Sequence, residues 1–354
     1  MSSTRRYSKE EYLNILPKIA KKLDNIMIEP NWFEFTKCYN NKKSFGDCDV
    51  VLNKKYLKKD WLSILINEFE LINGNFLKNS EVFSFSYNEL QIDLIMTKDD
   101  EYRTSLVYFS YNDVSNLAGR LAKKLSVKYG HKGLELVIKN DDNVLGTMIL
   151  TKDTKTIHEF LDLNHEEYIK GFDELEDMFI WIANSKYFNK DIYLLHNRNA
   201  TSRVRDKKRA TYNAFLTWCE TKEFKNNHHY DVISEFGGYN IRQPFFDELV
   251  CTKFPQARDF YNTILDKFHS SNLFKEKFNG KIINELTRLS GIELGHFISY
   301  AKEQIELTNL KSLFINSSVH TCNQMILSLY NHYINGWTHW LNVPEDDAIR
   351  FIRG

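Results

Sequence analysis

Two aspartates, Asp47 and Asp49, lie two positions apart in a segment that becomes apolar, Gly46-Asp-Cys-Asp-Val-Val-Leu52. In a β-strand, residues i and i+2 point to the same face, so both carboxylates are expected to project together. Adjacent anions repel each other unless a cation lies between them, and carboxylate oxygens suit Mg²⁺. Asp93, in the apolar segment Leu90–Ile95, offers a third carboxylate from a neighbouring strand. The three aspartates therefore predict a catalytic site for two Mg²⁺ ions, with Mn²⁺ as an alternative, of the kind that supports nucleotidyl transfer.

The segments around these aspartates have the patterns of helices and strands. Ser8, followed by two glutamates, is typical of a helix N-cap, and apolar residues at helical spacing continue the helix to Leu23. The first 100 residues are therefore expected to form a small α+β domain with the carboxylates on its sheet. Its other strands are predicted at residues 32–35, 81–87 and 90–96, and its second helix at residues 56–72.

The composition limits the possible classes of protein. A chain of 354 residues can form two or three compact units. The formal net charge is zero, so any affinity for nucleic acid must come from local basic patches. The five cysteines are widely spaced without a Cys-x-x-Cys pair, which indicates a reducing compartment and no structural zinc. With no signal peptide or membrane span visible, we expect a cytoplasmic protein without a membrane partner, and its Asn- and Lys-rich composition is compatible with an AT-rich genome such as a viral one.

The segment from Tyr102 to Leu134 resembles the end of the palm and the nucleotide-binding subdomain of family X DNA polymerases, the polymerase beta type. That family has a third metal-binding Asp, then a Tyr-Phe turn, then a helix that carries an Asn and an Arg four residues apart. The resemblance implies a nucleotidyltransferase palm with a small mixed sheet at residues 1–100 and a nucleotide-binding subdomain at 101–172. The corresponding residues of this chain are Asp93, Tyr108, Phe109, Asn116 and Arg120.

The resemblance also implies the reaction. Asp47 and Asp49 would hold both metal ions, while Asp93 would hold the catalytic metal and orient the attacking 3′ hydroxyl. The partners would be a nucleoside triphosphate and a DNA 3′ end, with release of pyrophosphate, as in gap filling or end repair. The short N-terminal region leaves no room for the DNA clamps of larger family members, so the layout is closest to the short viral members.

Four further residues have implied roles at the incoming nucleotide. Tyr108 and Phe109 would pack against its sugar and disfavour a ribose hydroxyl. Asn116 would reach the minor-groove edge of its base, and Arg120 would reach the template side of the new base pair. These roles are typical of an enzyme with a template-reading ancestry.

The phosphate-binding part of the family pattern differs in this chain. The family has Gly-Ser some ten residues before the first metal-binding Asp, whereas Thr36 and Lys37 occupy those positions here. Gln91 stands where the family usually has an Arg. Without the glycine, the backbone cannot approach the phosphates closely, and lysines must supply the attraction. The residues expected to bind the nucleotide phosphates are Gly46, Lys37, Lys42 and Lys43.

Residues 173–354 have the pattern of an all-helical C-terminal domain. A segment near its start has six basic side chains and only one acidic one, Asp206. Such a cluster would release counterions on binding a phosphate backbone, so it predicts nucleic-acid binding, with the solvated start of a helix as the alternative. Further helices are predicted at residues 243–250, 257–268, 281–288, 292–306 and 320–333. The basic residues are Arg198, Arg203, Arg205, Lys207, Lys208 and Arg209.

A second resemblance leaves the substrate open. The segment from Asn279 to Ile298 is similar to the C-terminal helices of CCA-adding tRNA nucleotidyltransferases and bacterial poly(A) polymerases, which implies an RNA 3′ end. Three hypotheses follow: a DNA 3′-end nucleotidyltransferase, an RNA or tRNA 3′-terminal nucleotidyltransferase, and a catalytically inactive nucleotidyltransferase fold that binds nucleic acid. The departure at Thr36-Lys37 motivates the third, and the presence of all three carboxylates argues against it.

Overall fold

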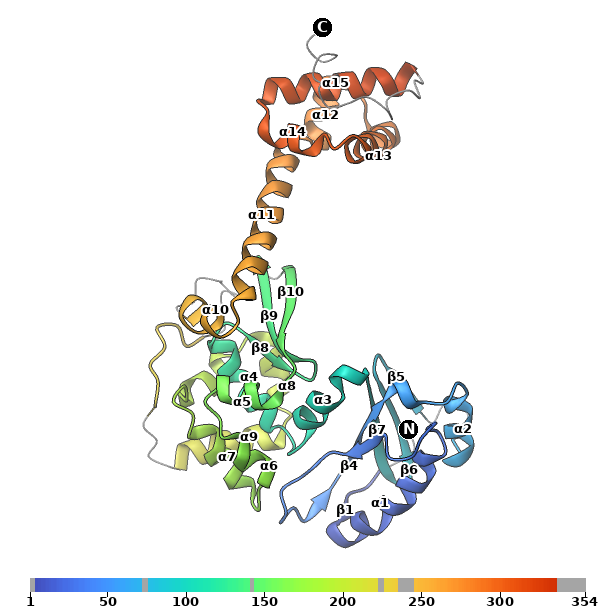
Figure 1. The fold of residues 1–354 in the computed structure, drawn as a ribbon, viewed down its shortest axis with the longest axis vertical. Helices are drawn as coiled ribbons and strands as arrows, with labels where there is room; N and C mark the ends of the chain where they lie inside the picture. The colour runs from blue at the N-terminus through green and yellow to red at the C-terminus, as the bar shows by residue number, and fades with distance from the viewer. Residues whose placement is uncertain (1–3, 72–75, 141–142, 222–225, 235–244, 336–354) are drawn as a thin grey trace. The chain divides into compact units, whose positions relative to one another are not determined.

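The computed structural model describes residues 4–71, 76–140, 143–221, 226–234 and 245–335 (Figure 1). The chain divides into two compact units, Met1–Arg258 and Asp259–Gly354. A mixed sheet with helices in the first unit confirms the predicted α+β class. The domain boundaries expected after residues 100 and 172 both fall inside the first unit. No helix of the described residues is long and apolar enough to span a membrane.

A five-stranded sheet in the order β2-β4-β7-β6-β5 is the framework of the first unit (Figure 1). The central strands β4 and β7 are parallel, and the other neighbours are antiparallel. Asn88 and Glu89 form the tight turn between β6 and β7, with φ of 49° and 64°, as a two-residue hairpin of this twist requires. The strands span Phe33–Phe35 (β2), Asp47–Asn53 (β4), Phe76–Asn79 (β5), Val82–Tyr87 (β6) and Leu90–Thr97 (β7).

Helices α1 (Lys9–Asp24) and α2 (Trp61–Glu68) pack on one face of this sheet. The predicted N-cap of α1 is confirmed, because Ser8 and Glu11 exchange hydrogen bonds in a capping box. Alternate residues of β4 point into this core, as the period of a strand requires. The buried core includes Cys48, Val50 and Leu52 of β4, Ile92 and Leu94 of β7, and Ile15, Ile19 and Leu23 of α1.

The opposite face of the sheet supports α3 (Tyr102–Phe109). Val51 of β4 and Ile95 of β7 form a small cluster with Tyr102 and Leu106 of this helix. Since Val51 shares its face with residues i−2 and i−4, the aspartates of β4 lie on the same side of the sheet as α3. A short N-terminal strand, β1 (Tyr7–Ser8), pairs antiparallel with β3 (Ser44–Phe45), directly before β4.

The rest of the first unit combines a small antiparallel sheet with short helices. Its strand order is β10-β9-β8, and these strands were not predicted from the residue pattern. Helix α7 (Leu175–Ala183) and the 3₁₀ turn η3 (Lys190–Tyr193) pack against α4 (Val114–Lys124) within the first unit. The strands are β8 (Lys128–Gly130), β9 (Gly133–Asn140) and β10 (Asn143–Thr151). The helices are α4 (Val114–Lys124), α5 (Thr154–Phe160), α6 (His165–Lys170), α7 (Leu175–Ala183), α8 (Ala200–Asp206), α9 (Ala210–Thr221) and α10 (Cys251–Lys253). Shorter turns of 3₁₀ helix span Lys54–Tyr56 (η1), Asp99–Glu101 (η2), Lys190–Tyr193 (η3) and Leu195–Asn197 (η4), and Phe246–Val250 (η5) is a π-helical turn.

The described residues of the second unit form helices joined by short turns, as predicted. Asn279 caps α12 by accepting hydrogen bonds from the amides of Lys281 and Ile282. Arg288, with φ of 64°, ends that helix in the left-handed region. The predicted helix at 243–250 begins outside the described residues. The helices are α11 (Gln256–Lys277), which crosses the unit boundary, α12 (Gly280–Thr287), α13 (Gly291–Leu307), α14 (Lys311–Asn316) and α15 (Val319–Asn335).

Candidate metal centre and its cavity

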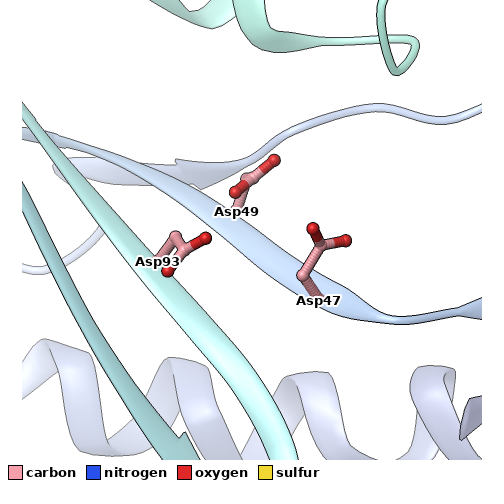
Figure 2. A group of neighbouring side chains, drawn as sticks. All are labelled: Asp47, Asp49 and Asp93. Carbon is pink, nitrogen blue, oxygen red and sulfur yellow. The ribbon is translucent and has the colours of Figure 1, made fainter. Parts of the chain in front are cut away.

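The structure brings the three predicted carboxylates together. Asp47 and Asp49 project from β4 and Asp93 from the adjacent strand β7 (Figure 2). The parallel register places Asp49 directly beside Asp93 and Asp47 beside Gln91. One carboxylate oxygen of each aspartate lies within 4.8 Å of the others. No basic side chain of the described residues forms an ion pair with any of the three carboxylates.

The surroundings of Asp49 disfavour the charged form of its carboxyl group. Burial, and then the neighbouring carboxylates of Asp47 and Asp93, raise its pKa to about 7, which the Lys42 ammonium partly opposes. The amide of Gln91 donates to both oxygens of Asp93, at 3.2 and 3.0 Å, and so orients that carboxylate. Three hard oxygen donors that lack a compensating cation fit a divalent ion such as Mg²⁺ or Mn²⁺.

The carboxylates lie in the wall of a cavity of about 790 Å³. This volume is within the range of about 300–1,000 Å³ that is common for small-molecule sites. Most of the lining comes from the sheet, the loop before β4, and α3, α4, α8 and α9, with further residues that include Arg6, Tyr12 of α1 and Leu175 of α7. Of the predicted nucleotide-binding and nucleic-acid-binding residues, those in the lining are Lys37, Lys42, Gly46, Tyr108, Phe109, Asn116, Arg205 and Arg209.

Tyr108 and Phe109 form the end of α3 and are fixed by other aromatic rings. Phe109 stacks on His131, with ring centroids 5.7 Å apart, and Tyr108 meets Tyr129 edge to face at 5.2 Å. Burial raises the pKa of Tyr108, and the guanidinium of Arg205 opposes this shift. The two rings therefore form a rigid apolar wall that ends at charged groups.

Asn116 has an unsatisfied amide at the cavity. Its oxygen accepts a hydrogen bond of 3.3 Å from Arg205. Its Nδ2 is buried and has no hydrogen-bond partner among the described residues. A buried donor without a partner costs about 1–3 kcal/mol, so an acceptor on a bound molecule would gain a favourable contact here.

The role expected for Arg120 needs correction, because this side chain does not reach the cavity. Arg120 is 2% exposed, and its Nε and Nη2 both donate to the carbonyl oxygen of Ile192, at 3.2 and 2.5 Å. It lies one helical turn beyond Asn116, where α4 packs against η3. The side chain therefore connects two parts of the first unit. Lys43, which was also expected at the nucleotide, is exposed and is absent from the lining.

The basic segment does not form one exposed patch, which also corrects the prediction. Arg198 and Asp206 form an ion pair of 2.7 Å, with side chains only 3% and 0% exposed. Arg205 also bonds Asp206, at 3.1 Å, and Arg209 bonds Asp113. One Nη of Arg203 donates to the backbone carbonyl of Arg198. Lys207 and Lys208 are exposed and form no ion pair or side-chain hydrogen bond with a described residue.

Two further basic residues line the cavity: Lys42, which was predicted to bind the phosphates, and Arg6. Lys42 donates to Asn112 Oδ1 at 3.0 Å and lies 4.8 Å from the ring centre of Phe45. Arg6 comes from the N-terminal arm and was not predicted, because an arginine just before a helix N-cap has no distinctive sequence signal. Its place at the cavity follows only from the pairing of β1 with β3.

Comparison with known proteins adds no family assignment. Neither a scan against models of known protein families nor a search of curated protein sequences finds a match for this chain.

Proposed function

We propose that this protein is a nucleotidyltransferase of the polymerase beta type that adds nucleotides from nucleoside triphosphates to a DNA 3′ end. One observation carries the proposal: three carboxylates from adjacent parallel strands converge in a cavity without a cationic partner among the described residues. Two divalent ions, when bound, supply activation of the 3′ hydroxyl and neutralisation of the charge on the leaving pyrophosphate.

The carboxylates would have distinct duties. Asp47 and Asp49, two residues apart on β4, would hold both ions. Asp93 would hold one ion and accept a hydrogen bond from the attacking 3′ hydroxyl. Gln91 already donates to this carboxylate and fixes its plane, which favours one productive orientation.

The other walls of the cavity would position the incoming nucleotide. The rigid rings of Tyr108 and Phe109 offer an apolar surface to the sugar. The free amide of Asn116 would donate to an acceptor on the base edge. Lys37 and Lys42 line the cavity and form no ion pair with a described residue, so they would attract the triphosphate.

An RNA 3′ end is the alternative substrate. The segment that resembles the tails of CCA-adding enzymes forms the helix pair α12 and α13, with a turn at Arg288 and Gly291. Helix pairs with such turns are common, so this observation favours RNA less strongly than the resemblance to family X DNA polymerases, carried by Asp93, Tyr108, Phe109 and Asn116, favours DNA.

Labelled-nucleotide incorporation tests the proposal. The protein is given a gapped DNA duplex or an unpaired RNA 3′ end, with deoxynucleotides or ribonucleotides in turn and Mg²⁺ present. We expect incorporation of deoxynucleotides into DNA, reduced on the order of 10³-fold or more in Asp49→Asn. The control Asp99→Asn, which removes an exposed carboxylate of the same unit outside the cavity, should keep activity. Absence of incorporation with every pair of substrates would refute the proposal, and a preference for ribonucleotides on RNA would shift it to the alternative.

A further inference from the structure

We infer that Arg6 of the N-terminal arm is a phosphate-binding residue that receives the triphosphate of the nucleotide. The inference rests on the proposed function and identifies the group that takes the place of the missing Gly-Ser. Arg6 lies in the lining of the cavity that holds the three carboxylates. It is 41 positions before Asp47 in the sequence, and β1 brings the two together by pairing with β3.

The two arginines of the arm differ in their partners. Arg5 is engaged with the protein surface: it bonds Glu11 at 2.8 Å and Glu89 at 3.2 Å, and it lies over the ring of Tyr7. Arg6 forms no ion pair with a carboxylate of the described residues. A cation that lines the cavity of the three carboxylates and forms no ion pair with a described residue is available for an anionic ligand.

Hydrogen bonds fix the Arg6 guanidinium in place. Its Nε donates to Ser44 Oγ at 2.8 Å, and its Nη2 donates to the carbonyl oxygen of Ser44 at 2.9 Å. The remaining nitrogen, Nη1, has no protein acceptor among the described residues. The guanidinium is thus oriented before any ligand binds, which reduces the entropy that binding costs.

Gly46 lets this guanidinium lie close to the metal-binding strand. A Cβ atom at this position would be 3.0 Å from Arg6 Nη1, closer than such atoms normally approach. Gly46 directly precedes Asp47, so the free nitrogen lies at the start of the carboxylate strand. A phosphate that contacts a metal ion bound to Asp47 would therefore lie close to Nη1 of Arg6.

The ligand chemistry that fits best is a chain of phosphates. Of the five cationic side chains in the lining, Arg205 and Arg209 are paired with aspartates, and the other three form no ion pair with a described residue: Arg6, Lys37 and Lys42. A triphosphate carries several charges on adjacent groups and can contact such a set and metal ions at once, whereas a phosphodiester backbone offers one charge per nucleotide. A planar guanidinium also matches two phosphate oxygens. We therefore assign Arg6 to the nucleotide and not to the nucleic-acid backbone.

Binding measurements without turnover test the assignment. The probe is a deoxynucleoside triphosphate with a methylene bridge between its α and β phosphates, titrated with Mg²⁺ into the full chain, and the matching monophosphate is the comparison ligand. Arg6→Met should weaken triphosphate binding on the order of 10-fold or more, and Arg6→Lys should lose less. Monophosphate binding should change little. Gly46→Ala, which displaces the guanidinium and keeps its charge, should weaken triphosphate binding as well.

Two controls separate Arg6 from other causes. Arg5→Gln removes the ion pairs of the neighbouring arginine and should leave triphosphate binding unchanged; an equal loss would attribute the effect to docking of the arm and overturn the inference. Binding of a single-stranded oligonucleotide should have the same salt dependence in Arg6→Met as in the wild type. A loss confined to the oligonucleotide would place Arg6 at the backbone and overturn the inference.

The outcome also separates this inference from the proposed function. Wild-type protein that binds no triphosphate would overturn both. Wild-type protein that binds and incorporates nucleotides, with Arg6→Met binding equally well, would overturn only the assignment of Arg6. Thermal unfolding of each variant verifies that a loss of binding is not a loss of fold.

Discussion

Two charged regions of the first unit line the same cavity and differ in how their charges are satisfied. The carboxylates of Asp47, Asp49 and Asp93 are held beside one another without a cationic partner among the described residues. The arginines of the basic segment are instead bonded inside the protein, and the pair of Arg198 with Asp206 is almost completely buried. The carboxylates of the first region therefore repel one another, whereas Arg198 of the second region is stabilised by its ion pair with Asp206.

This difference separates a binding site from a structural element. Like charges brought together in a fold require a ligand or a proton to become stable, which is a pattern typical of metal sites. Opposite charges that are buried together stabilise each other, and removal of either one lowers the free energy of unfolding because the other is left buried without a counter-charge. In the sequence, both regions are recognised only as clusters of charged residues. The structure distinguishes the binding site from the structural element by showing which charges are paired.

The largest expected effect concerns the buried ion pair. Asp206→Asn leaves the buried guanidinium of Arg198 without its counter-charge, and we expect a loss of about 3–5 kcal/mol in the free energy of unfolding. Urea unfolding measures this loss. Asp113→Asn, which removes the partner of Arg209 in a more exposed pair, should cost about 0–1 kcal/mol. Equal costs for the two variants would show that burial of the pair does not matter.

An effect of opposite sign is expected at the carboxylates. Asp49→Asn removes one of three crowded anions, so the metal-free variant should be more stable than the wild type above neutral pH. A gain of ~1 kcal/mol would raise Tm by about 2–4 °C in a domain of about 150–250 residues. Thermal unfolding in the presence of a chelator measures the difference.

The pH dependence of that difference follows from the raised pKa of Asp49. Between its ordinary pKa of 3.8 and its folded pKa of about 7, the folded state binds more protons than the unfolded state. Its contribution to stability is therefore fully present below about pH 3.8 and is lost as pH rises through about 7. The gap in Tm between Asp49→Asn and the wild type should be small at low pH and grow towards neutral pH. A gap that is constant with pH would contradict the crowding of charge at this residue.

The smallest expected effect concerns the exposed lysines of the basic segment. Lys207→Gln with Lys208→Gln should weaken oligonucleotide binding by a few fold and reduce the slope of log affinity against log salt by about 1–2. Lys18→Gln with Lys21→Gln, a change of the same charge on the exposed side of α1, is the control. An unchanged slope for the first pair would mean that Lys207 and Lys208 do not contact the nucleic-acid backbone.

The parts of the site that the sequence predicted correctly are those governed by short-range periodicity. Asp47 and Asp49 share a face because side chains alternate along a strand, and the apolar residues between and after them bury the other face. The N-cap at Ser8 is equally local. The prediction that Asp93 lies near the other two aspartates required one long-range assumption, that its strand is next to β4. The parallel pairing of β7 with β4 confirms this assumption.

The residues that the sequence did not place correctly depend on tertiary packing. Arg120 and Arg198 have long side chains whose direction is decided by a carbonyl or a carboxylate from another segment. Arg6 reaches the cavity through strand pairing of an arm that carries no motif. The sheet of β8, β9 and β10 was missed because none of its strands shows a clear alternation: β8 is short, β9 is almost uniformly buried, and β10 is mostly exposed or half-buried.

Direct metal binding tests the central claim, that the three carboxylates form a divalent-ion site. Mn²⁺ is titrated into metal-free protein at a pH above the Asp49 pKa of about 7, and the free ion is followed by its paramagnetic resonance signal. We predict that the wild type binds Mn²⁺, that Mg²⁺ displaces it, and that Asp49→Asn abolishes or greatly weakens this binding while Asp99→Asn does not. Wild-type protein that leaves Mn²⁺ free, or an Asp49→Asn variant that binds it as tightly as the wild type, would contradict the claim.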